Sequence, residues 1–524
     1  MKRRLVFMIA IAWLLSMTGV DTQTAFGSGG GQAFRMATTD LPESLNPREA
    51  DTSMGKTIAK GLFEGLVRLD DDGKAVPAIA KEWKISDDGK VYTFTLRDDA
   101  KWSNNQPVTA TDFEYAWKKA LAPDTYAPYY YLMFPIANAE LFSNGYITDA
   151  SQVGVRALNN TTLQVTLTKK LVYFPQLLAE PIFFPVNAAN ASTNESWAYQ
   201  ASTMVTNGPF KIGNWNTHEL ILAKNDKYYN AKTVHWDQAK FIELIDAAAA
   251  FAKQEIDLFG SDYFLNDSLS DSDIQFSNPS LSYYYQFNTT EAPFDNLKIR
   301  KALAMAVKRE QIDYGTPAFG FVPPGLHGVK SDFRSEVSDK TYFMEDINEA
   351  RRLLKEGLAE EGLAKLPKFK IIVNDSLDNS HTDIANVVIN NWKQNLGIEV
   401  EVEVQEWPEL IDNRYQMNYQ VARAGWAADY NDPAAFLEYF TSWSTDNDSG
   451  WSNENYDSYV KLASQTSDPA LRNKLYANAE KLLIEQMVII PLYYYSDYVV
   501  INPNLKDVFM DFDGSVEFVH GHFQ

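Results

Sequence analysis

The chain has 524 residues, of which 45% are hydrophobic and 13% aromatic. This length predicts two or three domains, and the apolar content excludes a disordered protein. The 69 acidic and 47 basic residues give a formal net charge of −22, which argues against nucleic acid and anionic membrane surfaces as partners.

The N-terminus has the pattern of a secretory signal peptide. Lys2, Arg3 and Arg4 precede a short apolar run over residues 5–17, which is brief for a membrane span. We expect a signal peptide over residues 1–25 and a flexible leader over 26–33. The sequence contains no cysteine, which excludes disulfides, thiolate chemistry and a lipid-anchored cysteine. We therefore expect an exported protein in the periplasm or at the exterior of the cell envelope.

Strand and helix patterns alternate along the rest of the chain. Alternating or apolar runs predict strands near residue 34 and at 91–97, 163–167, 370–373, 399–406, 419–423 and 488–494. Helical periodicity predicts helices at 112–121, 296–308, 348–356, 382–396 and 469–486. A short helix and strand are expected within 61–69, and the acidic run 70–73 reads as a hairpin turn. This alternation indicates α/β domains built on mixed sheets.

The segment 421–433 carries the clearest functional signal. It places a cation (Arg423), an aromatic ring (Trp426) and an anion (Asp429) within seven residues. Such groups can hold the two charged ends of a zwitterion such as a peptide. Gly425 and Ala427 are small enough to let a ligand backbone approach. The alternative is a buried, salt-bridged strand followed by an Asn-Asp-Pro turn.

Several stretches together resemble the extracellular solute-binding proteins of the peptide and nickel class, which feed ATP-driven importers. The resemblance rests on residues 80–121, 61–66, 206–210, 294–303 and 490–495. It implies an α/β fold like that of type II periplasmic binding proteins, with two lobes, a hinge and one extra domain. The implied boundaries are 34–64, 187–280 and 498–524 for lobe I, 65–186 for domain II and 281–497 for lobe III.

The segment 421–433 is most similar to the oligopeptide-binding branch of that family. The resemblance implies that Asp429 receives the α-ammonium of a peptide, and that Arg423 and Arg414 meet its C-terminal carboxylate. The other peptide-binding positions that it implies are His381, Tyr284, Thr52 and Ser53. Trp426, Tyr284 and the tyrosine cluster at 129–131 would line side-chain pockets, although that cluster could instead serve in packing.

The sequence departs from that pattern at four points. Gln286 stands where many oligopeptide binders have a glutamate, and Ala427 and Leu281 replace a cysteine pair. The stretch 308–324 is short and lacks a lysine found in some relatives. The usual lipidated cysteine is also missing.

Plainer interpretations accompany several of these residues. His381 could be a solvated residue in the first turn of a helix, and Arg414 could form a surface salt bridge. Arg423 and Asp429 could pair only with protein groups. His520 and His522 have a spacing that suits a metal, but we expect no metal site and no cofactor.

We expect a monomeric, non-enzymatic protein that binds an oligopeptide and delivers it to an ABC-type membrane permease, with no nucleic acid partner and no catalytic residues. The alternatives are the same fold with another solute (a nickel chelate, haem, a sugar or a cell-wall peptide), or a signalling or chaperone-like role. A secreted hydrolase is a further alternative, although the sequence lacks Gly-x-Ser-x-Gly, His-Glu-x-x-His and phosphate-loop motifs.

Overall fold

The computed structural model describes residues 32–524, apart from residues 71–72, 264, 266–268, 271, 278–279, 338–340 and 377. The predicted signal peptide and most of the predicted leader lie outside the described residues. Among the described helices, none combines the length and the apolar character that a bilayer crossing needs.

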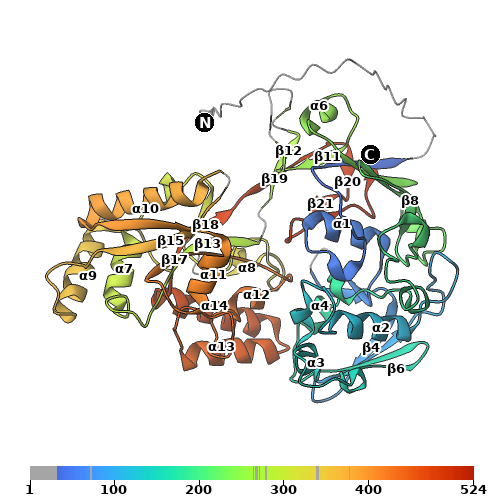
Figure 1. Cartoon of the computed structure of the whole chain (residues 1–524), viewed down its shortest axis with the longest axis horizontal. Coiled ribbons are helices and arrows are strands. Elements are labelled where there is room, and N and C mark those ends of the chain that lie inside the picture. The colour runs from blue at the N-terminus through green and yellow to red at the C-terminus, as the bar shows by residue number, and fades with distance from the viewer. Residues whose placement is uncertain are drawn as a thin grey trace.

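The first and last parts of the chain share a mixed seven-stranded sheet, the core of lobe I (right in Figure 1). Its strands, in spatial order, are β12 (Ile274–Ser277), β19 (Asp497–Ile501), β11 (Leu258–Gly260), β1 (Ala33–Thr38), β10 (Gln238–Glu243), β9 (Glu219–Lys224) and β8 (Phe210–Trp215). Helices α1 (Ser53–Leu62), α5 (Ala188–Ala191) and α6 (Ala247–Ala252) accompany them. Two short C-terminal hairpins follow: β20 (Leu505–Lys506) with β23 (His522–Phe523), and β21 (Phe509–Met510) with β22 (Val516–Glu517).

A second mixed sheet, with six strands, is the core of lobe III (left in Figure 1). Its order is β14 (Gly315–Pro317), β18 (Ile489–Tyr495), β13 (Leu281–Phe287), β17 (Val421–Ala427), β15 (Phe369–Asn374) and β16 (Val400–Gln405). The helices of this lobe are α7 (Leu297–Met305), α8 (Phe333–Glu336), α9 (Ile347–Glu360), α10 (Ser380–Leu396), α11 (Trp407–Tyr415), α12 (Ala434–Leu437), α13 (Glu454–Gln465) and α14 (Pro469–Glu485).

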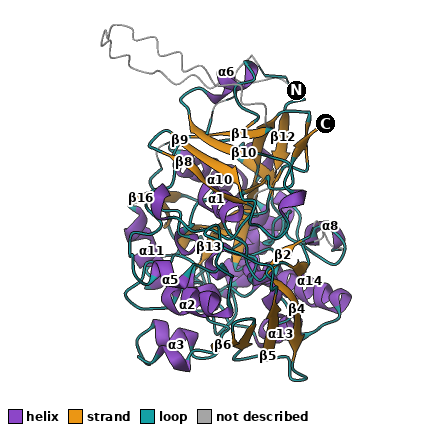
Figure 2. Cartoon of the chain, turned by 90° about the vertical axis from the view of Figure 1, so that its right-hand side faces the viewer, coloured by secondary structure: helices purple, strands orange, loops and turns teal. Residues whose placement is uncertain are grey.

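Domain II has an antiparallel four-stranded sheet of its own. Its strands are β4 (Ala80–Ile85), β5 (Val91–Leu96), β7 (Thr162–Thr166) and β6 (Val155–Asn159), with helices α2 (Ala110–Ala120), α3 (Ala139–Ser143) and α4 (Phe174–Leu177) and the hairpin β2 (Val67–Leu69)–β3 (Ala75–Pro77). Alternate residues of β5 (Tyr92, Phe94 and Leu96) are buried, which explains its period-two pattern. In Figures 1 and 2 this domain lies at the opposite end of the molecule from the seven-stranded sheet.

The chain passes between the two large sheets as a two-stranded ribbon. β12 pairs antiparallel with β19 in one sheet, and β13 pairs antiparallel with β18 in the other. Ser496 is the single residue that separates β18 from β19. The strands that flank the two crossings are therefore paired with each other, which places the two connections between the lobes near one another.

Domain II also touches lobe III directly. The ring of Tyr173 stacks on Tyr430 with centroids 5.2 Å apart, and its hydroxyl donates to Glu438 at 2.9 Å. The N–H of Val172 donates to the carbonyl of Ser464 at 3.0 Å. These contacts give the two large lobes a second connection through domain II.

The predicted mixed α/β architecture is confirmed, and so are the predicted helices, which correspond to α2, α7, α9, α10 and α14. The run 70–73 does join two antiparallel strands, and Gly73 has a φ of +69° there, although Asp71 and Asp72 lie outside the described residues. The strand predicted at 419–423 is displaced. It runs from Val421 to Ala427, because Gly425, Trp426 and Ala427 continue the pairing with β13.

Candidate ligand-binding site

Strand β17 ends beside the crossing between the lobes. Ala427 pairs with Leu281, the first residue of β13, so these two residues do stand face to face. The next N–H, that of Ala428, donates to the carbonyl of Ser280 within the crossing at 2.8 Å. Asp429 therefore follows a backbone contact that fixes the end of the strand against the hinge region.

Asp429 is half-buried and forms no ion pair with any residue that the structure describes. Burial raises the pKa of its carboxyl to about 6, while a hydrogen bond with Tyr131 and the charge of Lys56 oppose the rise. Tyr131 belongs to domain II, and Lys56 belongs to α1 of lobe I. A carboxylate of lobe III thus faces groups from both other parts of the molecule, without a cationic partner of its own.

Arg423 is the second charged group of the segment. Its guanidinium carbon lies 5.1 Å from the ring centroid of Tyr283 and 5.8 Å from that of Trp407. Its Nε is buried and has no hydrogen-bond partner among the described residues, and it too lacks an ion pair there. An arginine held by aromatic faces keeps its donors for a carboxylate.

His381 lies in the first turn of α10, close to Arg423. Its Nδ1 is 3.3 Å from the hydroxyl of Tyr283, and the two rings are 5.6 Å apart. Burial and the charge of Arg423 lower the pKa of His381 to about 4. The imidazole is therefore neutral at neutral pH and can donate or accept a hydrogen bond.

Trp426, Gly425 and Ala427 complete the exposed end of β17. The indole of Trp426 donates to the carbonyl of Ala435 at 2.6 Å and packs edge-on against Tyr439 at 4.5 Å. A Cβ built on Gly425 would lie 3.6 Å from the guanidinium of Arg423. The missing side chain thus leaves the approach to Arg423 open, and Ala427 is exposed.

Two of the predicted residues are buried in lobe III. Tyr284 has no exposed surface, and its ring packs against Phe321 and Phe440. Arg414 is 6% exposed, its Nε lies 2.9 Å from Asp448 Oδ2, and it donates to the hydroxyl of Tyr439 at 2.8 Å. In this conformation neither side chain is open to a ligand.

The position with the unusual glutamine belongs to the same buried cluster. Gln286 donates to Asp448 and to the hydroxyl of Tyr419. Asp448 therefore supplies the negative charge that balances Arg414, while residue 286 itself is neutral. The alternative of a surface salt bridge for Arg414 is wrong about its location, because the ion pair with Asp448 is buried.

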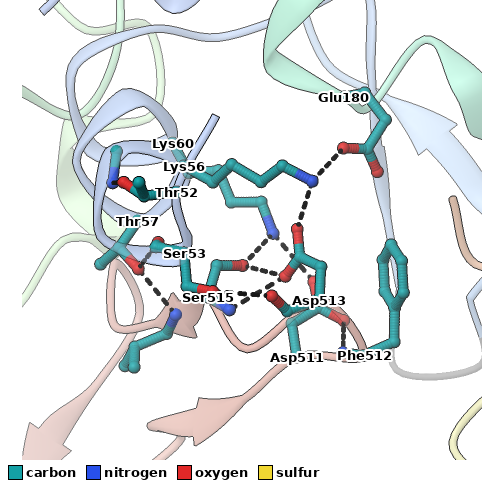
Figure 3. A network of polar contacts seen from close by, with 12 residues as sticks. Thr52, Ser53, Lys56, Thr57, Lys60, Glu180, Asp511, Phe512, Asp513 and Ser515 are labelled. Carbon is teal, nitrogen blue, oxygen red and sulfur yellow. Dashed lines mark hydrogen bonds and ion pairs between the residues drawn. The ribbon is translucent and has the colours of Figure 1, made fainter. Parts of the chain in front are cut away.

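The opposite side of the site is the N-terminus of α1. Thr52 caps this helix by accepting from the N–H of Gly55 at 3.0 Å, and both Thr52 and Ser53 are exposed. The hydroxyl of Ser53 donates to the carbonyl of Asp513 at 2.9 Å (Figure 3). The side chains are thus used within the protein, and the carbonyls of Thr52 and Ser53 accept from the N–H of Lys56 and the hydroxyl of Thr57.

The run of three tyrosines at 129–131 was expected to line side-chain pockets or to serve only in packing, and the fold brings Tyr131 of this run to Asp429. The sequence pattern did not single out Lys56 or Asp513, which the fold brings to the site from two other distant segments.

Comparison with known proteins shows which family the chain belongs to. Residues 74–448 match the family model described as "Bacterial extracellular solute-binding proteins, family 5 Middle". The chain belongs to the family 5 solute-binding proteins. The oligopeptide-binding protein OppA of Bacillus subtilis is 34% identical over 553 residues, covering 100% of both chains.

Solved structures of family 5 proteins show the same two-lobed fold. An unliganded open form of the periplasmic murein tripeptide-binding protein MppA gives a TM-score of 0.78 at 31% identity, covering 93% of this chain and 95% of that one. Listeria monocytogenes OppA bound to peptide gives 0.68 at 29% identity, covering 94% and 99%. The TM-score is thus higher for the open form of MppA than for the peptide-bound OppA.

Proposed function

We propose that this protein captures oligopeptides between lobes I and III and delivers them to an ABC-type membrane importer. The observation that carries the proposal is Asp429, a half-buried carboxylate with no cationic partner among the described residues. An ionised group removed from water without a partner lowers stability. We propose that the α-ammonium of a bound peptide supplies the opposite charge that this carboxylate lacks.

Arg423 supports the same proposal at the other end of a ligand. Its free Nε and aromatic surroundings suit the C-terminal carboxylate. His381 adds a neutral hydrogen-bonding group beside it. The peptide backbone would lie along the exposed end of β17 and the turn at Thr52 and Ser53, which gives recognition independent of side chains.

The names of the relatives agree with a binding role rather than an enzymatic one. The B. subtilis relative is named an oligopeptide-binding protein, and another structural relative, from Bacillus anthracis, is described as the substrate-binding domain of an oligopeptide ABC transporter. We propose that the protein works as an exported monomer, with no nucleic acid partner, cofactor or metal. The boundaries expected for lobes I and III and domain II are part of this proposal.

Closure is proposed to occur about the two-stranded ribbon at Ser496. Because both crossings lie there, a small backbone rotation can bring α1 toward β17. Tyr284 and Arg414 then act by packing and by balancing charge behind the site. Thr52 and Ser53 act through their backbone.

The test is calorimetric titration of a free tripeptide and of its N-acetylated form. We expect acetylation, or the substitution Asp429→Asn, to weaken binding by more than about tenfold, because a charge-assisted contact of about 1.5–3 kcal/mol is lost. Asp412→Asn removes an exposed carboxylate of α11 in the same lobe and serves as the matched control. Equal affinity for both forms of the peptide would overturn the assignment of Asp429.

A further inference from the structure

A buried ionic network lies directly behind the α1 side of the site (Figure 3). Lys56 and Lys60, one helical turn apart on α1, both point toward the turn and strands of the C-terminal hairpin β21–β22. Lys60 Nζ lies 2.8 Å from Asp511 Oδ2 and 3.1 Å from Glu517 Oε1. Lys56 Nζ lies 3.1 Å from Asp513 Oδ2.

Lys56 differs from Lys60 in the parts of the molecule that it joins. Its ammonium also lies 3.5 Å from Glu180 Oε2 and 4.6 Å from the ring centroid of Tyr129, both in domain II. It is only 4% exposed. Lys56 thus connects α1 of lobe I, the C-terminal hairpin and domain II at one buried point.

Two continuous paths lead from Lys56 to the ligand-binding site. On one path, the Tyr129 ring lies 6.2 Å from the ring of Tyr131, which interacts with Asp429. On the other, Asp513 receives Lys56 on its carboxylate and the hydroxyl of Ser53 on its carbonyl, at 3.1 and 2.9 Å.

We propose that Lys56 is a positioning residue of the peptide site, which holds Tyr129 and Tyr131 toward Asp429 and holds Ser53 at the start of α1. This inference rests on the proposed peptide-binding function. Burying the charge of Lys56 costs free energy, and two carboxylates offset this cost, because Glu180 and Asp513 lie on opposite sides of the ammonium in Figure 3. Lysine suits this place because a compact ammonium can meet two carboxylates and a ring face at once.

The charges around the network agree with this role. Burial would lower the pKa of Lys56, but Glu180 and Asp513 raise it above its ordinary value, so the side chain stays charged. Burial raises the pKa of Glu180 to about 7, and Lys56 opposes that rise. The groups that act on Asp429 are Tyr131, Lys56 and Asp446, and Lys56 is the one cation among them.

The experiment compares Lys56→Met with Lys60→Met in the full-length protein, with a free tripeptide as the ligand in calorimetry. Both variants lose ion pairs with the same hairpin, buried at Lys56 and partly buried at Lys60, and we expect both to melt at a lower temperature. Lys56→Met should weaken peptide binding by about tenfold, as for residues coupled through a shared network. Lys60→Met should bind within about twofold of the original protein.

A pH profile separates positioning from a general loss of stability. Without Lys56, only the hydrogen bond with Tyr131 opposes the effects of burial and of Asp446 on the pKa of Asp429, so the pH below which affinity falls should move upward. Lys60→Met should leave that pH unchanged, and Lys56→Arg should restore part of the affinity.

Tyr129→Leu provides a second test that leaves every charge of the network in place. It should weaken binding in the same direction, and it decides the matter if Lys56→Met does not fold. Equal affinities for the Lys56 and Lys60 variants, or unchanged binding by Tyr129→Leu, would overturn the inference. If Asp429→Asn also binds the peptide with unchanged affinity, the proposed function is wrong. If Asp429→Asn loses affinity but the Lys56 and Tyr129 variants do not, the role proposed for Lys56 is wrong.

Discussion

The two sides of the candidate ligand-binding site differ in whether their charged side chains form ion pairs. On lobe III, Asp429 and Arg423 have no ion pair within the described part of the chain. On the α1 side, Lys56 and Lys60 are both paired with carboxylates. In the proposed function, the unpaired charges meet the ends of a ligand and the paired charges keep the opposite wall in place.

This difference predicts opposite effects on stability when one carboxylate is neutralised on each side. Asp513→Asn should lower the free energy of unfolding by about 3 kcal/mol, because it removes one partner of the buried Lys56. Asp429→Asn should leave the stability unchanged or raise it, because it removes a half-buried charge that forms no ion pair with any described residue. Urea denaturation without ligand measures both, and a loss of stability for Asp429→Asn as large as that for Asp513→Asn would remove the contrast.

Arg423 tests the unpaired side through affinity. Arg423→Met should weaken peptide binding by about 1.5–3 kcal/mol, the range for a hydrogen bond to a charged group. The same peptide with an amidated C-terminus should bind both proteins alike, since it offers no carboxylate. Arg352→Met, which removes an exposed arginine on α9, is the control and should bind normally. If Arg423→Met weakened binding of the amidated peptide as much as binding of the free peptide, Arg423 would not contact the C-terminal carboxylate.

The pH dependence of binding follows from the pKa of Asp429. In the free protein burial raises this pKa to about 6, and a bound ammonium must lower it, because an opposite charge favours the ionised carboxylate. Binding therefore releases a proton at acidic pH, and affinity should fall by up to about tenfold per pH unit below pH 6. His381, with a pKa of about 4, stays neutral over most of that range. Titrations between pH 5 and 8 on the order of one unit apart measure this slope, and an affinity independent of pH would contradict it.

The smallest effect is expected at the contact between domain II and lobe III. Tyr173→Phe removes the hydrogen bond to Glu438 but keeps the ring on Tyr430, so we expect a loss of about 1 kcal/mol in stability. Peptide affinity should change by less than about twofold, because neither charged wall of the site is altered. A larger loss of affinity would show that this contact shapes the loop of Asp429.

Local patterns in the sequence were sufficient for much of the secondary structure. The alternation in β5 and the cap of α2 at Thr109, whose N–H donates to Asp112 at 2.8 Å, both reflect contacts between near neighbours. Helices α11 and α13 were not predicted. Strand β17 extends four residues beyond its predicted end because β13, more than a hundred residues earlier in the chain, supplies the pairing.

The site was predicted in part for the same reason. Arg423, Trp426 and Asp429 lie close together in sequence, so one segment sufficed to suggest them. The burial of Arg414 depends on Asp448, thirty-four residues away, and no local pattern indicates which of many acidic residues becomes its partner.

By itself, the sequence determined the α/β class and the resemblance to solute-binding proteins, because composition, periodicity and short motifs act over a few neighbouring residues. Only the tertiary structure decided which charges remain unpaired. Among the described residues Asp429 forms no ion pair, whereas Lys56 has two carboxylates, because folding brings α1, domain II and the C-terminal hairpin together. Pairing of charges depends on distance in space, and the fold alone sets that distance.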